Sequence, residues 1–155
     1  MHKNKSVEVI ADRANNDSLI VACAESLTAG AIASELAKGE NASEWFAGGV
    51  ASYMSETKFK VLGVTPGPVI TESCAREMVE GVCRLMAADV AVAVTGVGGP
   101  DEEEGEPSGT VYIATHVEGR TEVTRHQFEG DPPEVLEQTT QVALERLAAR
   151  YETET

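Results

Sequence analysis

The sequence has no apolar run long enough to cross a membrane. None of its 155 residues belongs to an uninterrupted apolar stretch near the ~20 residues that a membrane-spanning helix needs. Residues 1–18 are charged throughout and lack the apolar core of a signal peptide. These two absences predict a soluble, cytoplasmic protein with no membrane partner.

Basic and aromatic residues are scarce. The chain has 12 Lys and Arg against 26 Asp and Glu, a net charge of −14, and 5% aromatic residues. Because such an acidic surface repels phosphate backbones, we expect no nucleic-acid partner. An acidic, lysine-poor surface suits a protein kept soluble in concentrated salt. We therefore expect a halophilic source, with an acidic mesophilic protein as the alternative.

Cysteine is also sparse. Cys23, Cys74 and Cys83 are odd in number and have no CxxC spacing, which argues against a disulfide framework. Cys74 and Cys83 are nine residues apart. That spacing puts them on opposite faces of a helix, which turns by ~100° per residue. We expect three free thiols that are buried or half-buried.

Apolar patterning predicts helices that alternate with strands through the first two thirds of the chain. Ser55 and Gly63 are the predicted N-cap and end of the second short helix. The predicted helices are 4–15, 28–38, 55–62 and 71–87, and the predicted strands are 19–24, 48–53 and 89–95.

The last third of the sequence predicts a β-hairpin followed by a helix. Strands over 110–116 and 122–128 are joined by so short a turn that they must be antiparallel. The final helix runs from Pro133 to Tyr151, with Asp131 as its N-cap. The sequence thus predicts one α/β domain over residues 1–155, with a mixed sheet of about five strands and helices on both faces.

Ligands of such sheets bind beyond the carboxyl ends of the strands, here after Ala24, Tyr53 and Thr95. Ser26 follows the first strand. A serine hydroxyl becomes a nucleophile only beside a base. Ser26 and the nearby Thr28 are also ordinary helix-capping residues, which is the alternative to a catalytic role.

Lys58 is the candidate base. It falls in the first turn of the predicted 55–62 helix, where a cation opposes the helix macrodipole and its pKa is lowered. A solvated helix lysine is the alternative, and we expect Lys60 to be exposed. If Ser26 is a nucleophile, Lys58 is its base.

The third strand end is rich in glycine. Gly96, Gly98 and Gly99 follow Thr95, and their backbone N–H groups could approach an anion closely. The segment is neither GxGxxG nor a P-loop, and an ordinary turn is the alternative.

No metal site or cofactor is expected. The acidic run 101–106 has neither a nearby histidine nor EF-hand spacing, so a solvated loop accounts for it. The histidines are scattered, and form no metal-ligand pair or catalytic triad: His2, His116 and His126.

Four blocks resemble, in order and spacing, the C-terminal domain family of the competence/damage-inducible protein CinA. They are AESLTAG (24–30), WFAGGVASYMSETK (45–58), VTGVGGP (94–100) and PSGTVYIA (107–114). The stand-alone members of this family include nicotinamide-nucleotide amidases. The resemblance implies a three-layer α/β/α fold with a five-stranded mixed sheet. It also implies hydrolysis of nicotinamide mononucleotide to nicotinate mononucleotide and ammonia.

The resemblance further implies a metal-free catalytic group of Ser26, Tyr53 and Lys58. N–H groups around Thr28 to Gly30 would stabilise the oxyanion, and the glycine-rich loop would hold the rest of the pyridine mononucleotide. The residues assigned to substrate binding are Glu25, Thr28, Ala29, Gly30, Thr95, Gly96, Gly98 and Gly99.

The sequence also departs from the family pattern. Leu27 replaces a common cysteine, which removes a rival nucleophile, while Ala29 replaces a glycine and Met54 replaces a serine. A non-catalytic mononucleotide-binding or regulatory domain is therefore the alternative function. Exposed apolar helix faces would suit a small homo-oligomer.

Overall fold

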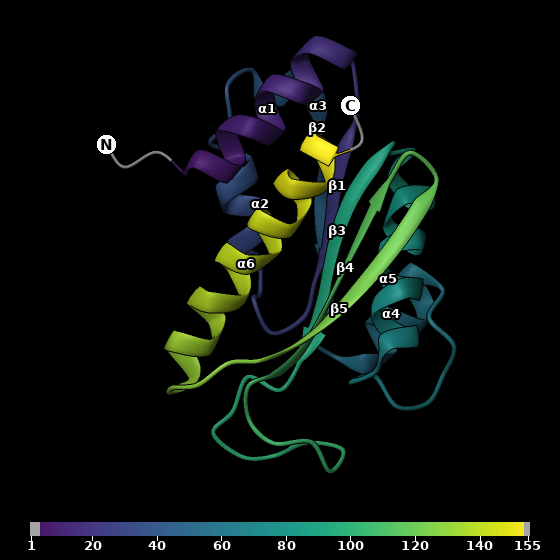
Figure 1. Cartoon of the computed structure of the whole chain (residues 1–155). Helices are drawn as coiled ribbons and strands as arrows, with labels where there is room; N and C mark the ends of the chain where they lie inside the picture. The colour runs from purple at the N-terminus through teal and green to yellow at the C-terminus, as the bar shows by residue number, and fades with distance from the viewer. Residues whose placement is uncertain (1–3, 154–155) are drawn as a thin grey trace.

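A mixed five-stranded sheet lies between two layers of helices in the computed structural model (Figure 1). The structure describes residues 4–153; residues 1–3, which include His2, and residues 154–155 lie outside the described part. The strands are β1 (Val21–Glu25), β2 (Phe46–Ala51), β3 (Val90–Gly96), β4 (Thr110–Val117) and β5 (Arg120–Gln127). The helices are α1 (Lys5–Asp17), α2 (Ala31–Leu36), α3 (Ala42–Trp45), α4 (Ser55–Leu62), α5 (Glu72–Met86) and α6 (Pro132–Thr153).

The strand order is β2-β1-β3-β4-β5. β1 pairs in parallel with both β2 and β3, and the hairpin strand β4 is antiparallel to β3 and β5. Every residue of β1 is buried, as are all those of β3 before Gly96. This matches the prediction from their uninterrupted apolar sequence, because central parallel strands are covered on both faces. The predicted mixed sheet with helices on both faces is confirmed.

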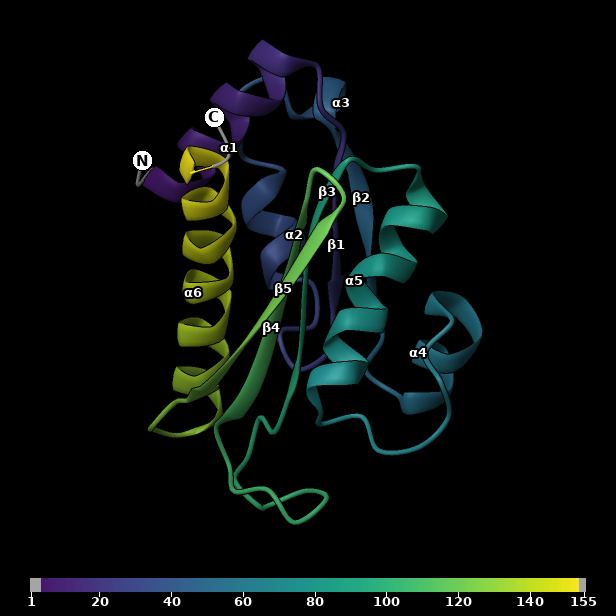
Figure 2. The ribbon, with the colours of Figure 1, turned by 45° about the vertical axis from the view of Figure 1, so that its right-hand side comes forward.

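Two cores lie on opposite faces of the sheet, and Figure 2 shows the sheet nearly edge-on between them. One core packs beneath α1, α2 and α6, and takes Cys23 from β1. The other packs beneath α4 and α5, and takes Ala22 and Ala24 from the same strand. Alternate side chains of a strand point to opposite faces, so β1 contributes to both cores.

Several predicted element ends are confirmed. Gly63 ends α4 with a φ of +71°, and the Asp131 carboxylate accepts the backbone N–H of Glu134 at 3.0 Å.

The three cysteines are all free, with Cys23 and Cys74 buried and Cys83 half-buried, as the sequence predicted.

Two helix starts differ from the prediction. Ser55 is already helical, and Met54 is the cap residue, without a side-chain cap. The helix predicted over 28–38 begins only at Ala31, because Ala29 (φ +49°) and Gly30 (φ +102°) have left-handed backbone conformations that an α-helix cannot contain. Among residues 4–153, no helix is both long and apolar enough to cross a membrane.

Candidate functional site

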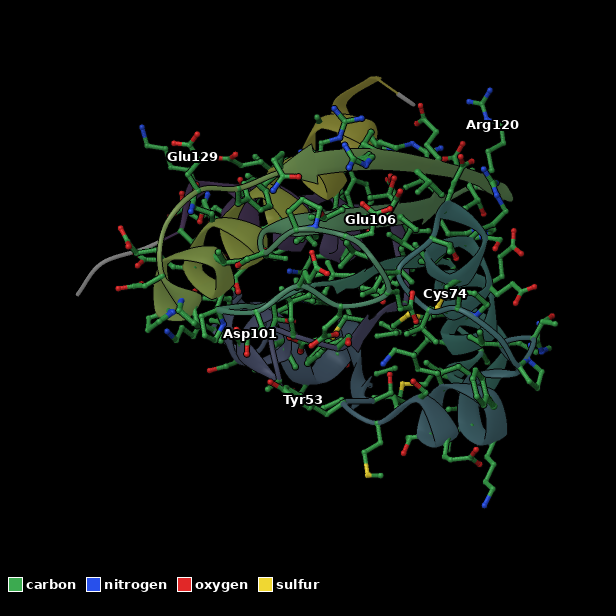
Figure 3. All side chains as sticks on the ribbon, turned by 90° about the horizontal axis from the view of Figure 1, so that it is seen from below. Tyr53, Cys74, Asp101, Glu106, Arg120 and Glu129 are labelled. Atoms are coloured by element: carbon green, nitrogen blue, oxygen red, sulfur yellow. The ribbon has the colours of Figure 1, made fainter. Side chains whose placement is uncertain are left out.

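The carboxyl ends of β1, β2 and β3 meet at one edge of the sheet, together with the long β3–β4 loop. Figure 3 looks onto this edge from below, where Tyr53, Cys74, Asp101 and Glu106 are labelled. All three strand ends singled out from the sequence therefore lie together.

Glu25 ends β1 and is 1% exposed. Its carboxylate accepts the Thr28 hydroxyl at 2.6 Å and the backbone N–H groups of Ile32 and Ala33, both at 2.9 Å. These are charge-assisted hydrogen bonds at the start of α2, where the helix dipole also favours a negative charge. Both carboxylate oxygens are thus engaged within the protein, so Glu25 fixes the turn after β1 and does not face a ligand.

Thr28 is not the cap that its sequence position predicted. Gly30 is the cap residue of α2 and has no side chain, so the Glu25 carboxylate caps the helix through Ile32 and Ala33, while the Thr28 hydroxyl donates to Glu25. The turn is closed by the N–H of Ala29, which donates to the Ser26 carbonyl at 3.1 Å. The N–H groups of Thr28 and Gly30 make no hydrogen bond within residues 4–153.

Ser26 follows β1 directly, in the bend where the strand ends, two residues after Ala24 of the core beneath α4 and α5. Ser26 is 8% exposed, and its hydroxyl makes no hydrogen bond to any residue that the structure describes. Neither the expected capping role nor a bond to Lys58 is present, and the hydroxyl is left unengaged.

Ser52 links the end of β1 to Lys58. Its N–H and its hydroxyl both donate to the Glu25 carbonyl, at 2.7 Å and 3.0 Å. Its own carbonyl accepts the Lys58 amine at 2.5 Å. Ser52 is completely buried. No sequence pattern singled out this residue, because it acts largely through its backbone.

Lys58 is 1% exposed, so the alternative of a solvated helix lysine is wrong. Burial lowers the pKa of Lys58, whereas Cys74, Glu103 and Glu104 oppose that shift. The predicted direction is confirmed, but its main cause is loss of solvation rather than the helix macrodipole. Lys60 is exposed, as expected.

Cys74 is the other nucleophilic side chain near Lys58. Burial raises the pKa of its thiol to about 11, which the Lys58 charge and the Thr95 hydroxyl only partly offset. The raised pKa disfavours the thiolate, which is the nucleophilic form of Cys74.

Tyr53 follows β2 but does not join this group in the structure. Its side chain is 71% exposed, as is that of Met54, and its hydroxyl makes no hydrogen bond to any residue in the range 4–153. Figure 3 has Tyr53 at the rim of the edge. It therefore does not orient Lys58 in this conformation.

The glycine-rich loop lies against the turn that follows Ser26. A Cβ atom added to Gly98 would lie 3.7 Å from the Leu27 Cβ, and one added to Gly96 would clash with the Thr110 carbonyl at 2.4 Å. Gly99 precedes a cis peptide bond to Pro100. The glycine-rich loop that the sequence analysis singled out therefore lies next to the turn that follows Ser26.

Thr95 and the acidic loop both bind the connection between α4 and α5. The Thr95 hydroxyl donates to the Val69 carbonyl at 2.8 Å. The Glu104 carboxylate accepts the N–H of Val69 at 2.9 Å and that of Ile70 at 2.8 Å. The acidic loop is exposed from Asp101 to Gly105, as predicted, but Glu104 also has backbone partners within the protein. Its neighbours gave no local pattern from which this partner could have been found.

No group of three or more metal-ligating side chains occurs among residues 4–153. The edge instead combines a free hydroxyl, a buried amine and unpaired backbone N–H groups. Such groups can perform acyl transfer, in which a base activates the hydroxyl and N–H groups stabilise the oxyanion.

Known proteins resemble this chain over nearly its whole length. YdeJ of Escherichia coli is 34% identical over 137 residues, which cover 84% of this chain and 80% of YdeJ. A Listeria innocua relative that carries a competence-damage inducible name is 40% identical over 116 residues. That match covers 72% of this chain, but this chain spans only 28% of the Listeria protein.

Solved structures also resemble this chain over most of its length. A CinA superfamily protein from Escherichia coli superimposes with a TM-score of 0.90 at 32% identity, over 93% of this chain and 87% of that one. One from Klebsiella pneumoniae gives 0.91 at 28% identity, over 99% of each chain. Residues 3–151 match the model of the CinA C-terminal domain. The chain belongs to the CinA C-terminal domain family.

Proposed function

We propose that this protein is an amidohydrolase that converts nicotinamide mononucleotide and water to nicotinate mononucleotide and ammonia. The observation that carries the proposal is that a Ser26 hydroxyl without a hydrogen bond to residues 4–153 and the buried, desolvated Lys58 amine follow the parallel strands β1 and β2 at the same edge of the sheet. The membership of this protein in the CinA C-terminal domain family also supports the proposal.

In the proposed reaction, neutral Lys58 takes the Ser26 proton as the serine oxygen bonds to the carboxamide carbon. The resulting oxyanion accepts N–H groups of the turn after Ser26, and collapse expels ammonia, which takes the proton from Lys58. Water then loses a proton to the same amine and attacks the acyl-serine ester; the serine oxygen leaves with that proton, which restores the Ser26 hydroxyl and neutral Lys58 and releases nicotinate mononucleotide. The bond from Lys58 to the Ser52 carbonyl uses one hydrogen of the amine, which leaves the lone pair of the neutral form for Ser26.

Contact between the Ser26 hydroxyl and Lys58 would form when substrate is bound, because catalytic hydrogen bonds often tighten only in the substrate complex. Tyr53 is exposed at the rim, so any part it plays in orienting Lys58 or relaying the proton would also require bound substrate. The glycine-rich loop after Thr95 would hold the ribose phosphate or the pyridine ring.

The test is ammonia release from nicotinamide mononucleotide by the purified protein in concentrated salt. We expect Ser26→Ala to lower kcat by at least about 10³-fold, as removal of a nucleophile does, while nucleotide binding and folding persist. Ser55→Ala is the matched control, since this serine on α4 makes no side-chain hydrogen bond to residues 4–153. Full turnover by Ser26→Ala would refute the assigned nucleophile.

A mononucleotide-binding domain without catalysis is the second candidate. It is favoured by the lack of a hydrogen bond between Ser26 and Lys58 and by the exposure of Tyr53. Calorimetric binding of the nucleotide by the wild-type protein, without ammonia release, would establish this second function and reject the first.

A further inference from the structure

We propose that Glu104 is a positioning residue of the candidate site: its carboxylate clamps the backbone of Val69 and Ile70 and so holds the β3–β4 loop beside Lys58. The inference rests on the proposed function, in which Lys58 is the base. Glu104 lies outside the residues assigned to catalysis or substrate binding, and its sequence context predicted only a solvated loop.

The first support is the folded shape of the loop. The N–H and carbonyl groups of Glu103 bond to those of Glu106, at 3.1 Å and 2.8 Å, and close a two-residue turn. Glu104 and Gly105 form its centre, with φ of +53° and +78°. Two positive φ values define a type I′ turn, which favours Asn, Asp or Gly over Glu at its first central position. Glu104 therefore lies at the tip of a defined turn in the β3–β4 loop.

The second support is what this side chain meets. The Glu104 carboxylate accepts two consecutive backbone N–H groups, those of Val69 and Ile70. The Thr95 hydroxyl donates to the Val69 carbonyl from the other direction. Residues 63–71 contain neither helix nor strand. These side-chain bonds therefore tie an irregular segment both to β3 and to the β3–β4 loop.

The third support is the electrostatic effect of the β3–β4 loop on Lys58. The titratable groups that act on Lys58 are Cys74 on α5 and Glu103 and Glu104 on the β3–β4 loop. The negative charge of Glu104 favours protonated Lys58, against the effect of burial. Loss of that charge should lower the pKa of Lys58, and the amine should become neutral at a lower pH.

Glu104→Gln tests the proposal, with Glu102→Gln as the matched control. Glu102 is exposed, belongs to the same loop, and makes no side-chain hydrogen bond or ion pair to residues 4–153. For Glu104→Gln we expect kcat with nicotinamide mononucleotide to fall about tenfold, the effect of losing one charge-assisted hydrogen bond. The acid limb of its pH–rate profile should move to lower pH. Glu102→Gln should match the wild type in both.

Two further measurements separate the clamp from the charge. Amide hydrogen exchange at Val69 and Ile70 should accelerate in Glu104→Gln but not in Glu102→Gln. Glu104→Asp keeps the charge on a shorter side chain, so it should accelerate exchange while leaving the acid limb nearly in place. Identical kinetics and identical exchange in Glu104→Gln and Glu102→Gln would overturn the inference.

Failure of the proposed function gives a different result. If the wild-type protein releases no ammonia, the amidase proposal falls, and the Lys58 amine can still be titrated by NMR. A lower titration midpoint and faster Val69 exchange in Glu104→Gln would then support the clamp as a feature of the site. Wild-type values for both would reject it.

Discussion

Lys58 carries a charge that the fold has removed from water. Burial lowers its pKa from the ordinary value of 10.5, so between the folded-state value and 10.5 the unfolded chain binds more protons. Stability therefore rises with pH across that window, and the buried charge is a cost below it. We expect Lys58→Met to raise the free energy of unfolding at pH 7 by about 1 kcal/mol.

The gain from Lys58→Met should shrink as the pH rises from the lowered folded-state pKa of Lys58 toward 10.5, above which Lys58 is neutral in both the folded and the unfolded chain. Urea denaturation at pH 7 and pH 10 measures both effects. Lys60→Met, at an exposed position of the same helix, should show neither. A Lys58→Met protein that is less stable than the wild type at pH 7 would mean that the bond to Ser52 outweighs the burial cost.

Single residues of the site were predictable where their role depends on the kind of side chain and on its position at the end of a predicted strand. Ser26 and Lys58 could be singled out because a hydroxyl and an amine stood at strand ends. Ser52 and Glu104 could not, since they act on backbone groups far away in sequence or through their own backbone. Glu25 was noticed, but its partners on α2 are backbone N–H groups, which carry no sequence signature.

The contact between α4 and α5 fixes the element that carries Lys58. A Cβ atom added to Gly81, in the middle of α5, would lie 2.0 Å from the carbonyl oxygen of Leu62 at the end of α4. Helix propensity alone favours Ala over Gly by about 1 kcal/mol. A backbone clash cannot be relieved by a rotamer change, so we expect Gly81→Ala to destabilise the protein by about 1–3 kcal/mol.

Gly81→Ala should also lower the rate of ammonia release, because α4 must shift and Lys58 moves with it. Chemical denaturation and the ammonia assay measure the two effects. Leu85→Ala is the control on the same helix, since Leu85 is 52% exposed; its change should stay within about 0.5 kcal/mol. A Gly81→Ala protein of higher stability would show that the two helices have room to separate.

Helices and strands were predictable from the sequence wherever one pattern of apolar residues, either a continuous run or a helical stripe, persisted along the element. The apolar runs of β1 and β3 and the helical stripe of α5 predicted their types and near-correct bounds. The start of α2 was missed because left-handed Ala29 is set by the Glu25 contacts that organise the turn, not by helical periodicity. The single turn α3 is too short for a period to be detected.

The whole molecule is dominated by its negative charge. A net charge of −14 on 155 residues opposes association with nucleic acid and, at low salt, with another copy of the chain. The exposed large apolar side chains are Tyr53, Met54, Val61 and Leu85. A small homo-oligomer and a halophilic source both stay predictions, and both depend on how far salt screens this charge.

Salt should therefore stabilise the fold. The Debye length falls from ~10 Å at 0.1 M to ~3 Å at 1 M, which removes most repulsion between exposed carboxylates. The few attractive ion pairs on the surface, such as Arg76–Glu72, are weakened too, but exposed pairs contribute about 0–1 kcal/mol each. Excess repulsion should win, because acidic residues outnumber basic ones by 26 to 12.

We expect the melting temperature to rise by roughly 5–10 °C between 0.1 M and 1 M KCl, the shift that about 2–3 kcal/mol produces in a domain of this size. Calorimetric scans at both concentrations measure it. Sucrose at the osmolality of 1 M KCl is the control, because it favours compact states through exclusion but screens no charge. An equal rise in sucrose, or no rise in KCl, would show that charge repulsion does not limit the stability of this fold.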